Sequence, residues 1–474
     1  MNEIIYKCFK TNHNHYVYDR NTGCILLISP KDYACLKAFD PTTDRDNPAV
    51  LDVLSRYQKA GFLLPSRLKK LKHPETYNIE HYLNYRLKQL VLQVTQQCNL
   101  RCEYCAYSGN YANNRVHSNK RMDFDMAKKA IDMFISRSSE NPEINVSFYG
   151  GEPLLEFDLV KRCVLYSHEI SEKRILHNMT TNGTLLTDEI VDFLVKYDFD
   201  LLISLDGSRE EHNKNRKFAN GEGSFDTIIN NVMHLWERYP DYFANKVRFN
   251  TVINAKTDIC CSERFFKASA FIDNKQTLFS MISPDNEDKS FFDFSDAFYQ
   301  KINYEKIKLF LSMINKLPDS CISPLVINTK DSIRALYKSV HGQNLLPETF
   351  HHGGPCLPGI RKTFVAVDGT MYPCEKVGES SEYAKIGSIT EGFNLDSICF
   401  LLNNGSITHD ECMKCWNLRE CNICIGQVFT KEQTPCKKDK LVNCRLSKEE
   451  TIDKFVELCT LRECGYKLPQ DGLD

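Results

Sequence analysis

Twenty-one cysteines in 474 residues constrain this chain more than any other feature, and they are unevenly spread. Three lie within eight residues, in Cys98-Asn-Leu-Arg-Cys102-Glu-Tyr-Cys105, and eleven more lie between Cys356 and Cys464. A chain of this length can bury enough apolar surface to fold without disulfides. An odd number of cysteines also fits a disulfide framework poorly. Grouped thiols that stay reduced more often bind metal, so metal binding is the first prediction.

Composition excludes several classes of protein. The apolar share is 42% and the charged share is 26%, which are ordinary for a globular protein and rule out disorder of the whole chain. Sixty Lys and Arg against 62 Asp and Glu leave a net charge of −2, so no basic field favours a nucleic acid. Residues 1–8 lack the order of a signal peptide, and no stretch reaches the ~18 apolar residues of a membrane helix. We therefore expect a cytoplasmic protein with neither a nucleic-acid nor a membrane partner.

The first segment, residues 1–85, is predicted to be a separate small α+β unit followed by a linker. Alternating residues predict strands at 15–19 and 24–29, with an Asn-Thr-Gly turn between them. Pro30 begins an expected helix that reaches residue 39, and an apolar stripe predicts a second helix over 49–60. The charged run at 67–73 is interpreted as the linker.

Residues 86–345 alternate between strand and helix patterns. Apolar runs predict strands at 90–94, 144–149, 176–180, 201–205 and 247–253, with a weaker one at 278–282. A helical stripe of apolar residues follows Asp123. Such alternation predicts an α/β fold with a parallel sheet or partial barrel, whose active site lies at the carboxyl ends of the strands. Residues 285–345 are interpreted as a lid or bridge, and the Cys-rich residues 346–474 as a third domain.

The motif Cys98-x3-Cys102-x2-Cys105 directly follows the first predicted strand of this region. Three thiolates on one short loop can supply three of the ligands of a small metal centre, but not a fourth. Iron–sulfur clusters normally take four cysteine ligands, so such a loop leaves one iron open to a molecule from solution. A chance grouping, or half of a zinc site, is the alternative interpretation.

With Tyr104 before its last cysteine, this motif resembles the cluster-binding loop of radical SAM enzymes. The resemblance covers most of residues 88–285 and implies a partial (β/α)6 barrel. It also implies a 4Fe–4S cluster held by the three cysteines, whose open iron chelates S-adenosylmethionine (SAM). One electron, from a reductant such as flavodoxin or ferredoxin, then cleaves SAM to a 5′-deoxyadenosyl radical. The protein's task is to orient this chemistry and to exclude competing reactions.

Further segments at predicted strand ends resemble SAM-binding elements of the same family. Phe148-Tyr-Gly150-Gly151-Glu152-Pro153 resembles the GGEP element, in which two glycines let the backbone approach a ligand, although Gly-Gly is also simply a turn. Polar groups follow the next two strands, and an arginine downstream matches one that relatives use for the SAM carboxylate. The residues implied in cofactor binding are Tyr104, Gly150, Gly151, Glu152, Pro153, Thr181, Asn182, Ser204, Asp206 and Arg216.

The C-terminal cysteines form a second constellation, Cys412-x2-Cys415-x5-Cys421-x2-Cys424. Zinc ribbons show similar paired spacing and are the alternative. Together with the upstream motif, the pattern resembles a SPASM domain, which holds two auxiliary 4Fe–4S clusters, although its last step is one residue shorter than usual. The resemblance implies a distal cluster on Cys412, Cys415, Cys421 and Cys444, and a proximal cluster on Cys356, Cys374 and Cys424. Either Cys436 completes the proximal cluster, or an open iron there binds a substrate thiolate.

Residues 367–374 are predicted to form a hairpin with an Asp-Gly turn that ends at Cys374. Glu375, next to this cysteine, lies where some relatives carry an acidic proton acceptor. We interpret Glu375 as a candidate catalytic base, and the alternative is a surface carboxylate on a turn.

Residues 1–70 resemble, in pattern only, a RiPP recognition element, a winged-helix-like unit that captures the leader of a precursor peptide. A structural cap on the barrel is the alternative. The combination resembles maturases of Cys-rich ribosomal peptides with Cys-x-x-x repeats, and implies a thioether-forming peptide maturase of the sactipeptide or ranthipeptide type. The alternatives are an anaerobic sulfatase-type maturase, a radical SAM peptide enzyme that forms C–C bonds or epimerises residues, and a zinc-binding scaffold without enzymatic activity.

Overall fold

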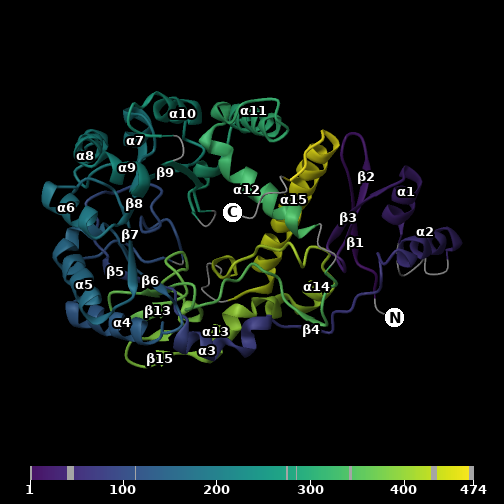
Figure 1. Ribbon diagram of the computed structural model, residues 1–474, viewed down its shortest axis with the longest axis horizontal. Coiled ribbons are helices and arrows are strands. Elements are labelled where there is room, and N and C mark those ends of the chain that lie inside the picture. Colours follow the sequence, from purple (N-terminus) through teal and green to yellow (C-terminus); the bar gives the residue numbers. More distant parts are fainter. Residues whose placement is uncertain are drawn as a thin grey trace.

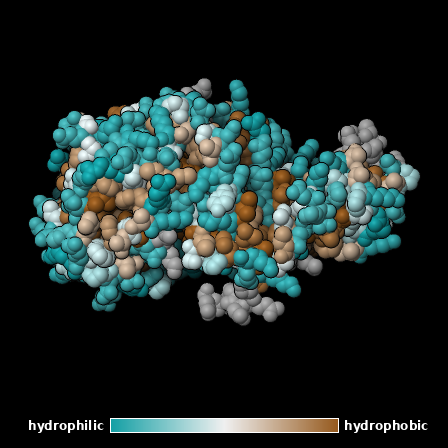
Figure 2. All heavy atoms as spheres, turned by 90° about the horizontal axis from the view of Figure 1, so that it is seen from above, coloured by the Kyte–Doolittle hydropathy of each residue, from teal (hydrophilic) through white to brown (hydrophobic). Residues whose placement is uncertain are grey.

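The computed structural model describes residues 3–39, 47–112, 114–273, 276–283, 286–340, 344–428 and 435–468. Figure 1 shows a broad α/β body, with the long helix α15 (Lys437–Glu463) between it and the N-terminal strands. Viewed from above, the molecule is elongated, narrower at the end where those strands lie, and largely hydrophilic on this face (Figure 2). None of the helices in the described ranges combines the length and the apolar character that a bilayer-spanning helix needs.

Six parallel strands form the central sheet and follow the predicted runs closely. Along the sheet they lie in the order β10-β9-β8-β7-β6-β5, and each neighbouring pair is parallel. The predicted partial (β/α)6 barrel is thus confirmed, and the strand predicted at 247–253 has the same bounds in the structure. The strands are β5 (Gln89–Thr95), β6 (Glu143–Gly150), β7 (Arg174–Thr181), β8 (Asp200–Ser204), β9 (Val247–Ile253) and β10 (Thr277–Met281).

Helices connect these strands and cover the outside of the sheet (Figure 1). The predicted stripe after Asp123 forms α4, which begins where the Asp123 side chain accepts a hydrogen bond from the Met126 N–H. Its apolar face is buried against the sheet. The connecting helices are α4 (Phe124–Ser136), α5 (Phe157–Ile170), α6 (Asp188–Lys196), α7 (Arg209–Asn215), α8 (Phe225–Arg238), α9 (Pro240–Lys246) and α10 (Ile259–Ala268).

The inner face of the barrel is more polar than the outer face. Along β9 the residues that face the helices, such as Phe249, are buried, while Arg248 and Asn250 alternate with them. A cavity of about 460 Å³ opens along this inner face, and its lining includes Ser147 and Asn178. The barrel therefore encloses a chamber lined by both polar and apolar side chains rather than a filled apolar core.

The C-terminal region joins the same sheet. β12 (Thr363–Val365) pairs in parallel with β5, and β13 (Thr370–Tyr372) returns antiparallel to it, which confirms the predicted hairpin. Gly369 in its turn has φ +84°, a backbone conformation that favours glycine. The sheet continues through β14 (Gly387–Ser388) and β15 (Gly392–Phe393). The extension was not predicted, because strands of two or three residues carry no periodic signal.

The N-terminal unit is a three-stranded antiparallel sheet with two helices, close to the predicted pattern; only β1 was not anticipated. It does not stand apart from the rest of the chain. Phe9, Tyr16 and Tyr18 share one buried cluster with Phe455 and Leu458 of α15. The elements are β1 (Tyr6–Lys10), β2 (His15–Asp19), β3 (Cys24–Ile28), α1 (Pro30–Ala38) and α2 (Pro48–Lys59).

The predicted linker contains a short strand, β4 (Lys70–Leu71), which pairs in parallel with β11 (Thr349–Phe350). The linker therefore attaches to the Cys-rich region. The remaining helices include two in the predicted bridge. They are α3 (Ile79–Tyr85), α11 (Asp296–Met313), α12 (Ile327–Ser339), α13 (Leu395–Leu402) and α14 (His409–Met413).

Candidate active site

Cys98, Cys102 and Cys105 lie on the loop that follows β5, at the carboxyl end of the sheet. Backbone N–H groups two residues on donate to two of the sulfurs, from Leu100 to Cys98 Sγ and from Tyr107 to Cys105 Sγ, both at 3.4 Å. The three thiols interact electrostatically with one another. The loop thus holds its thiols around one point and supplies donors to their sulfurs.

Burial is the main influence on these thiols and raises the pKa of Cys98 and of Cys102 to about 12. Bound metal would deprotonate them, because it stabilises the thiolate directly. Among the described residues, no three His, Cys, Asp or Glu side chains lie close enough together to hold a single metal ion. A four-iron cluster binds each thiolate at a different iron and therefore requires wider spacing.

The two glycines of the GGEP element pack against the cysteine loop itself. A Cβ placed on Gly150 would lie 2.1 Å from Thr95 O, and one on Gly151 would lie 2.1 Å from Gln97 O. Backbone hydrogen bonds close the contact, with Gly151 N donating to Thr95 O and Glu152 N to Gln97 O. These glycines therefore permit the backbone of the cysteine loop to approach closely. The sequence had instead predicted that they permit the approach of a ligand.

Glu152 links three strand ends beneath the cysteine loop. Its buried carboxylate accepts hydrogen bonds from Thr181 Oγ1 at 2.8 Å and from Asn182 N at 2.7 Å. The Asn182 amide in turn donates to Asn99 Oδ1 at 2.8 Å and to Cys98 Sγ at 3.8 Å. Burial raises the pKa of Glu152 to about 7, although these donors oppose the shift. Pro153, which follows, is buried at the start of a short 3-10 helix.

Tyr104, Asp206 and Arg216 form a second buried cluster beside the cysteine loop. The Tyr104 hydroxyl donates to Asp206 Oδ2, and Arg216 Nε donates to the same oxygen at 3.0 Å. The Arg216 guanidinium lies 5.3 Å from the centre of the Tyr104 ring. Burial lowers the pKa of Arg216, but the Asp206 charge more than offsets this and keeps the arginine charged. Ser204 lies at the end of β8, two residues before Asp206.

The segment before Cys356 packs against the loop that carries Cys424. Gly354 permits this approach, since a Cβ on it would lie 2.2 Å from Ile423 O. The Cys356 thiol interacts electrostatically with Cys424, and the Cys374 thiol with Cys356. Cys436 lies immediately before α15, at its N-cap.

Cys412, Cys415, Cys421 and Cys444 form a separate group, which we call the distal thiol group. The Cys421 thiol interacts electrostatically with Cys444 and Cys412. The Cys444 thiol interacts in the same way with Cys412 and Cys415. That this group holds a cluster stays a prediction. The loop that carries Cys415 and Cys421 is held to α15, where Ser447 Oγ donates to Asn422 Oδ1 at 3.1 Å.

Glu375 lines the barrel cavity rather than the molecular surface. Its side chain is 14% exposed, and its Oε1 pairs with Lys362 Nζ at 2.7 Å. Its Oε2 is buried without a hydrogen-bond partner among the described residues. Tyr149 lines the same cavity and interacts electrostatically with both Glu375 and Cys105. Glu375 and Tyr149 therefore belong to the cavity wall, whose described lining residues include no cysteine.

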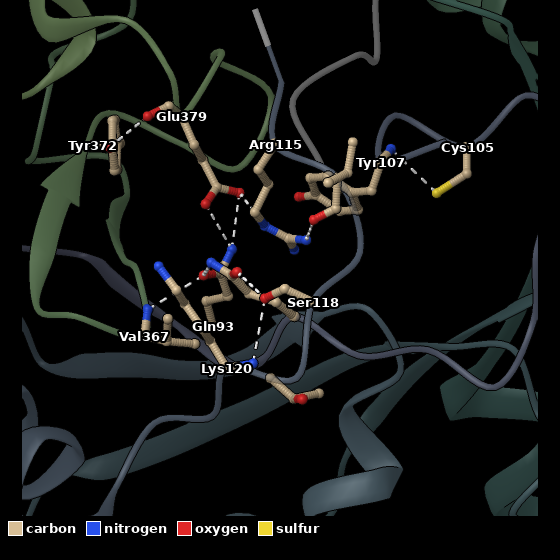
Figure 3. A network of polar contacts seen from close by, with 12 residues as sticks. Gln93, Cys105, Tyr107, Arg115, Ser118, Lys120, Val367, Tyr372 and Glu379 are labelled. Atoms are coloured by element: carbon tan, nitrogen blue, oxygen red, sulfur yellow. Dashed lines mark hydrogen bonds and ion pairs between the residues drawn. The ribbon is translucent and has the colours of Figure 1, made fainter. Parts of the chain in front are cut away.

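Figure 3 shows a polar network that sequence reasoning missed. Glu379, from the C-terminal region, accepts a hydrogen bond from Gln93 Nε2 at 2.8 Å and pairs with Arg115 Nε at 3.2 Å. The Arg115 guanidinium lies 3.6 Å from the centre of the Tyr107 ring. The network fixes the segment after Cys105 to the Cys-rich region. In the sequence, the residue that could have indicated this network is Gln93, a polar residue within the apolar run predicted as a strand at 90–94.

Parts of the chain are similar to known proteins. Residues 92–253 match the family model of the Radical SAM superfamily. An uncharacterised protein of Methanocaldococcus jannaschii is 34% identical over 200 residues, which are 42% of this chain and 64% of that protein, so the match spans less than two thirds of it. A cysteine-type anaerobic sulfatase-maturating enzyme of Clostridium novyi is 27% identical over 355 residues, 71% of this chain and 86% of that enzyme.

A solved structure, anSMEcpe with bound AdoMet and Kp18Cys peptide, has the same fold, with a TM-score of 0.56 and 20% identity. The match covers 80% of this chain and 99% of that one. Residues 92–253 thus form a radical SAM domain. The domain implies a 4Fe–4S cluster and SAM, and the three thiols on one loop fit that cluster, because thiolates are its usual ligands.

Proposed function

We propose that this chain is a radical SAM peptide maturase that forms Cys thioether crosslinks in a ribosomally made, Cys-rich precursor. Two observations support the proposal. Three C-terminal cysteines, Cys356, Cys374 and Cys424, interact electrostatically with one another, and Tyr149 in the wall of the barrel cavity interacts with Cys105 and with Glu375, the residue after Cys374. Three cysteines leave one cluster iron open to a substrate thiolate. Cys436, the alternative fourth ligand, would close that position.

The SAM-binding cluster would be held by Cys98, Cys102 and Cys105. Bound SAM supplies a 5′-deoxyadenosyl radical, and other residues of the chain would position the SAM molecule. Glu152 holds Asn182 beside the Cys98 sulfur, and Asp206 holds Arg216, whose remaining N–H groups suit the SAM carboxylate. The remaining SAM-binding candidates are Tyr104, Gly150, Gly151, Pro153, Thr181 and Ser204.

The crosslink removes two hydrogens from the peptide. One leaves a substrate carbon as a hydrogen atom and ends in 5′-deoxyadenosine. The other leaves the substrate thiol as a proton, for which the unpartnered Glu375 Oε2 is a suitable acceptor. One electron then remains as the C–S bond forms. Auxiliary clusters held by Cys356, Cys374 and Cys424 and by the distal thiol group would supply an acceptor for it.

The N-terminal unit is proposed to capture the leader of the precursor. Its three-stranded sheet has β1 and β3 as edge strands, and extended peptides bind sheet edges by adding a strand. A flavodoxin or ferredoxin is proposed as the reductant. The domains would then be residues 1–85 for the leader, 86–345 for radical chemistry and 346–474 for the auxiliary clusters.

A sulfatase-type maturase is the second candidate. The sulfatase-maturating enzyme of Clostridium novyi matches over 86% of its length, which favours a related protein substrate. The N-terminal unit is unexplained in this alternative, as it also is in a zinc-binding scaffold.

Co-expression tests the proposed reaction. We expect the gene to neighbour a short open reading frame rich in Cys, and this peptide is the substrate to use. The modified peptide should lose two hydrogens per crosslink, and the crosslinked thiol should resist alkylation. Glu375→Gln should still cleave SAM but should reduce crosslinked product at least about tenfold, because a general base typically contributes a factor of 10² to 10⁴. Mass spectrometry measures both outcomes.

Glu382→Gln is the matched control, since Glu382 lies seven residues further on and its side chain is 78% exposed. It should behave as the unmodified enzyme does. A peptide of unchanged mass with inverted stereocentres would refute thioether formation, and full crosslinking by Glu375→Gln would remove Glu375 from the mechanism.

A further inference from the structure

Two buried cations lie beside the distal thiol group. Lys440 is 1% exposed, and its Nζ donates to Asn404 O at 2.5 Å. Arg20 is also 1% exposed, and its Nη1 donates to Met413 O at 2.7 Å and to Cys415 O at 3.4 Å. Lysine and arginine are almost never fully buried unless they are paired, so both positions need an explanation.

Neither cation forms an ion pair with a carboxylate in the part of the chain that the structure describes. Each donates to neutral oxygens, and Arg20 also donates to Ser66 Oγ. A buried charge without a counter-charge costs several kcal/mol, on the order of the stability of a whole domain. The missing counter-charge should therefore be supplied by a group that the protein binds.

The thiols of the distal thiol group are the nearest common acidic neighbours of the two cations, although Glu411 also interacts with Lys440, and Asp19 and Glu3 interact with Arg20. Lys440 interacts electrostatically with Cys412, Cys444 and Cys421, and Arg20 interacts with Cys415. Lys440 and Cys444 are four residues apart on α15 and so lie on one face of that helix. Arg20 reaches the group from the N-terminal unit, in the turn between β2 and β3.

We propose that Lys440 and Arg20 are positioning residues that stabilise an anionic cluster on the distal thiol group and raise its reduction potential. The proposal rests on the auxiliary cluster assigned above. A cluster held by four thiolates is anionic, and reduction adds one more negative charge. Nearby buried cations therefore favour the reduced form, because their field is weakly screened.

Redox titration of the reconstituted full-length enzyme, followed by electron paramagnetic resonance, tests this proposal. Lys440→Met removes the charge and keeps most of the side-chain length. At a fixed potential it should lower the ratio of reduced to oxidised distal cluster at least about tenfold, which is about 59 mV for a one-electron couple. Arg20→Met should act in the same direction, and Lys440→Arg should restore the original potential. Lys438→Met, which removes an exposed charge two residues earlier on α15, is the matched control.

Thermal unfolding without iron gives a second readout. Without the cluster the buried ammonium is uncompensated, so Lys440→Met should match or exceed the stability of the unmodified chain, and it should lose this advantage once iron is bound. Equal potentials for Lys440→Met and Lys438→Met, at equal iron content, would overturn this proposal alone. An unmodified enzyme that binds iron only at Cys98, Cys102 and Cys105 would overturn both this proposal and the auxiliary clusters.

Discussion

Cys98→Ala should abolish reductive cleavage of SAM. Cys98 supplies one of only three thiols on the loop after β5, and its sulfur also receives donors from Leu100 and Asn182. Without it the cluster that would bind SAM keeps only two of its three cysteine ligands, and no other cysteine lies on that loop. The measurement is 5′-deoxyadenosine formed by the anaerobically reconstituted enzyme with SAM and a reductant, quantified by liquid chromatography.

Two other cysteine variants make this result interpretable. Cys260→Ala changes an exposed thiol on α10 and should leave SAM cleavage unchanged. Cys415→Ala should spare part of the cleavage, since Cys415 belongs to the distal thiol group. If Cys98→Ala and Cys415→Ala both retain full activity, the assignment of the cysteine loop is wrong.

Gly151→Ala should disable the same centre without touching a thiol. Its backbone φ is not in the left-handed region, so the added methyl group acts only through space. That methyl group would lie 2.1 Å from Gln97 O and 3.0 Å from Cys98 N, so the cysteine loop must move. Overpacking of this kind costs about 1–3 kcal/mol of stability. Because a displacement of about 1 Å at a reaction centre can cost about a hundredfold, we expect a loss of SAM cleavage of that order.

Gly353→Ala is the matched control, because nothing lies within 4 Å of its added Cβ and its φ is also ordinary. Both variants make the same chemical change in the same enzyme. Iron content, SAM binding and 5′-deoxyadenosine formation should fall in Gly151→Ala and stay unchanged in Gly353→Ala. Unaltered iron content and SAM cleavage in Gly151→Ala would show that contact with the loop is not what the GGEP glycines provide.

The barrel was predictable because each of its strands is a short buried run with its own signal. The run predicted at 247–253 became β9 with identical bounds, and that at 90–94 became β5 with one residue added at each end. The short strands β4 and β11 were missed. Their residues look like linker or loop, and they become strands only because a distant partner offers a free edge.

The candidate site was predictable where its residues carry both chemistry and spacing. The cysteines met both conditions, and several of their thiols interact within the sets that the resemblance implies, although their role as cluster ligands stays a prediction. Arg20 and Lys440 met neither, because charged residues are expected at the surface and no local pattern marks a buried one. The glycines of the GGEP element were recognised, but which backbone they approach depends on the packing of β6 against the loop after β5.

Transfer of deuterium tests the central claim most directly, namely that a radical made at the cysteine loop acts on a Cys-rich peptide. The precursor is prepared with deuterium at its non-exchangeable carbon positions and incubated with the enzyme, SAM and a reductant. We predict that one deuterium per molecule appears in 5′-deoxyadenosine and that crosslinked peptide forms in step with it. Unlabelled 5′-deoxyadenosine together with an unchanged peptide would contradict the claim.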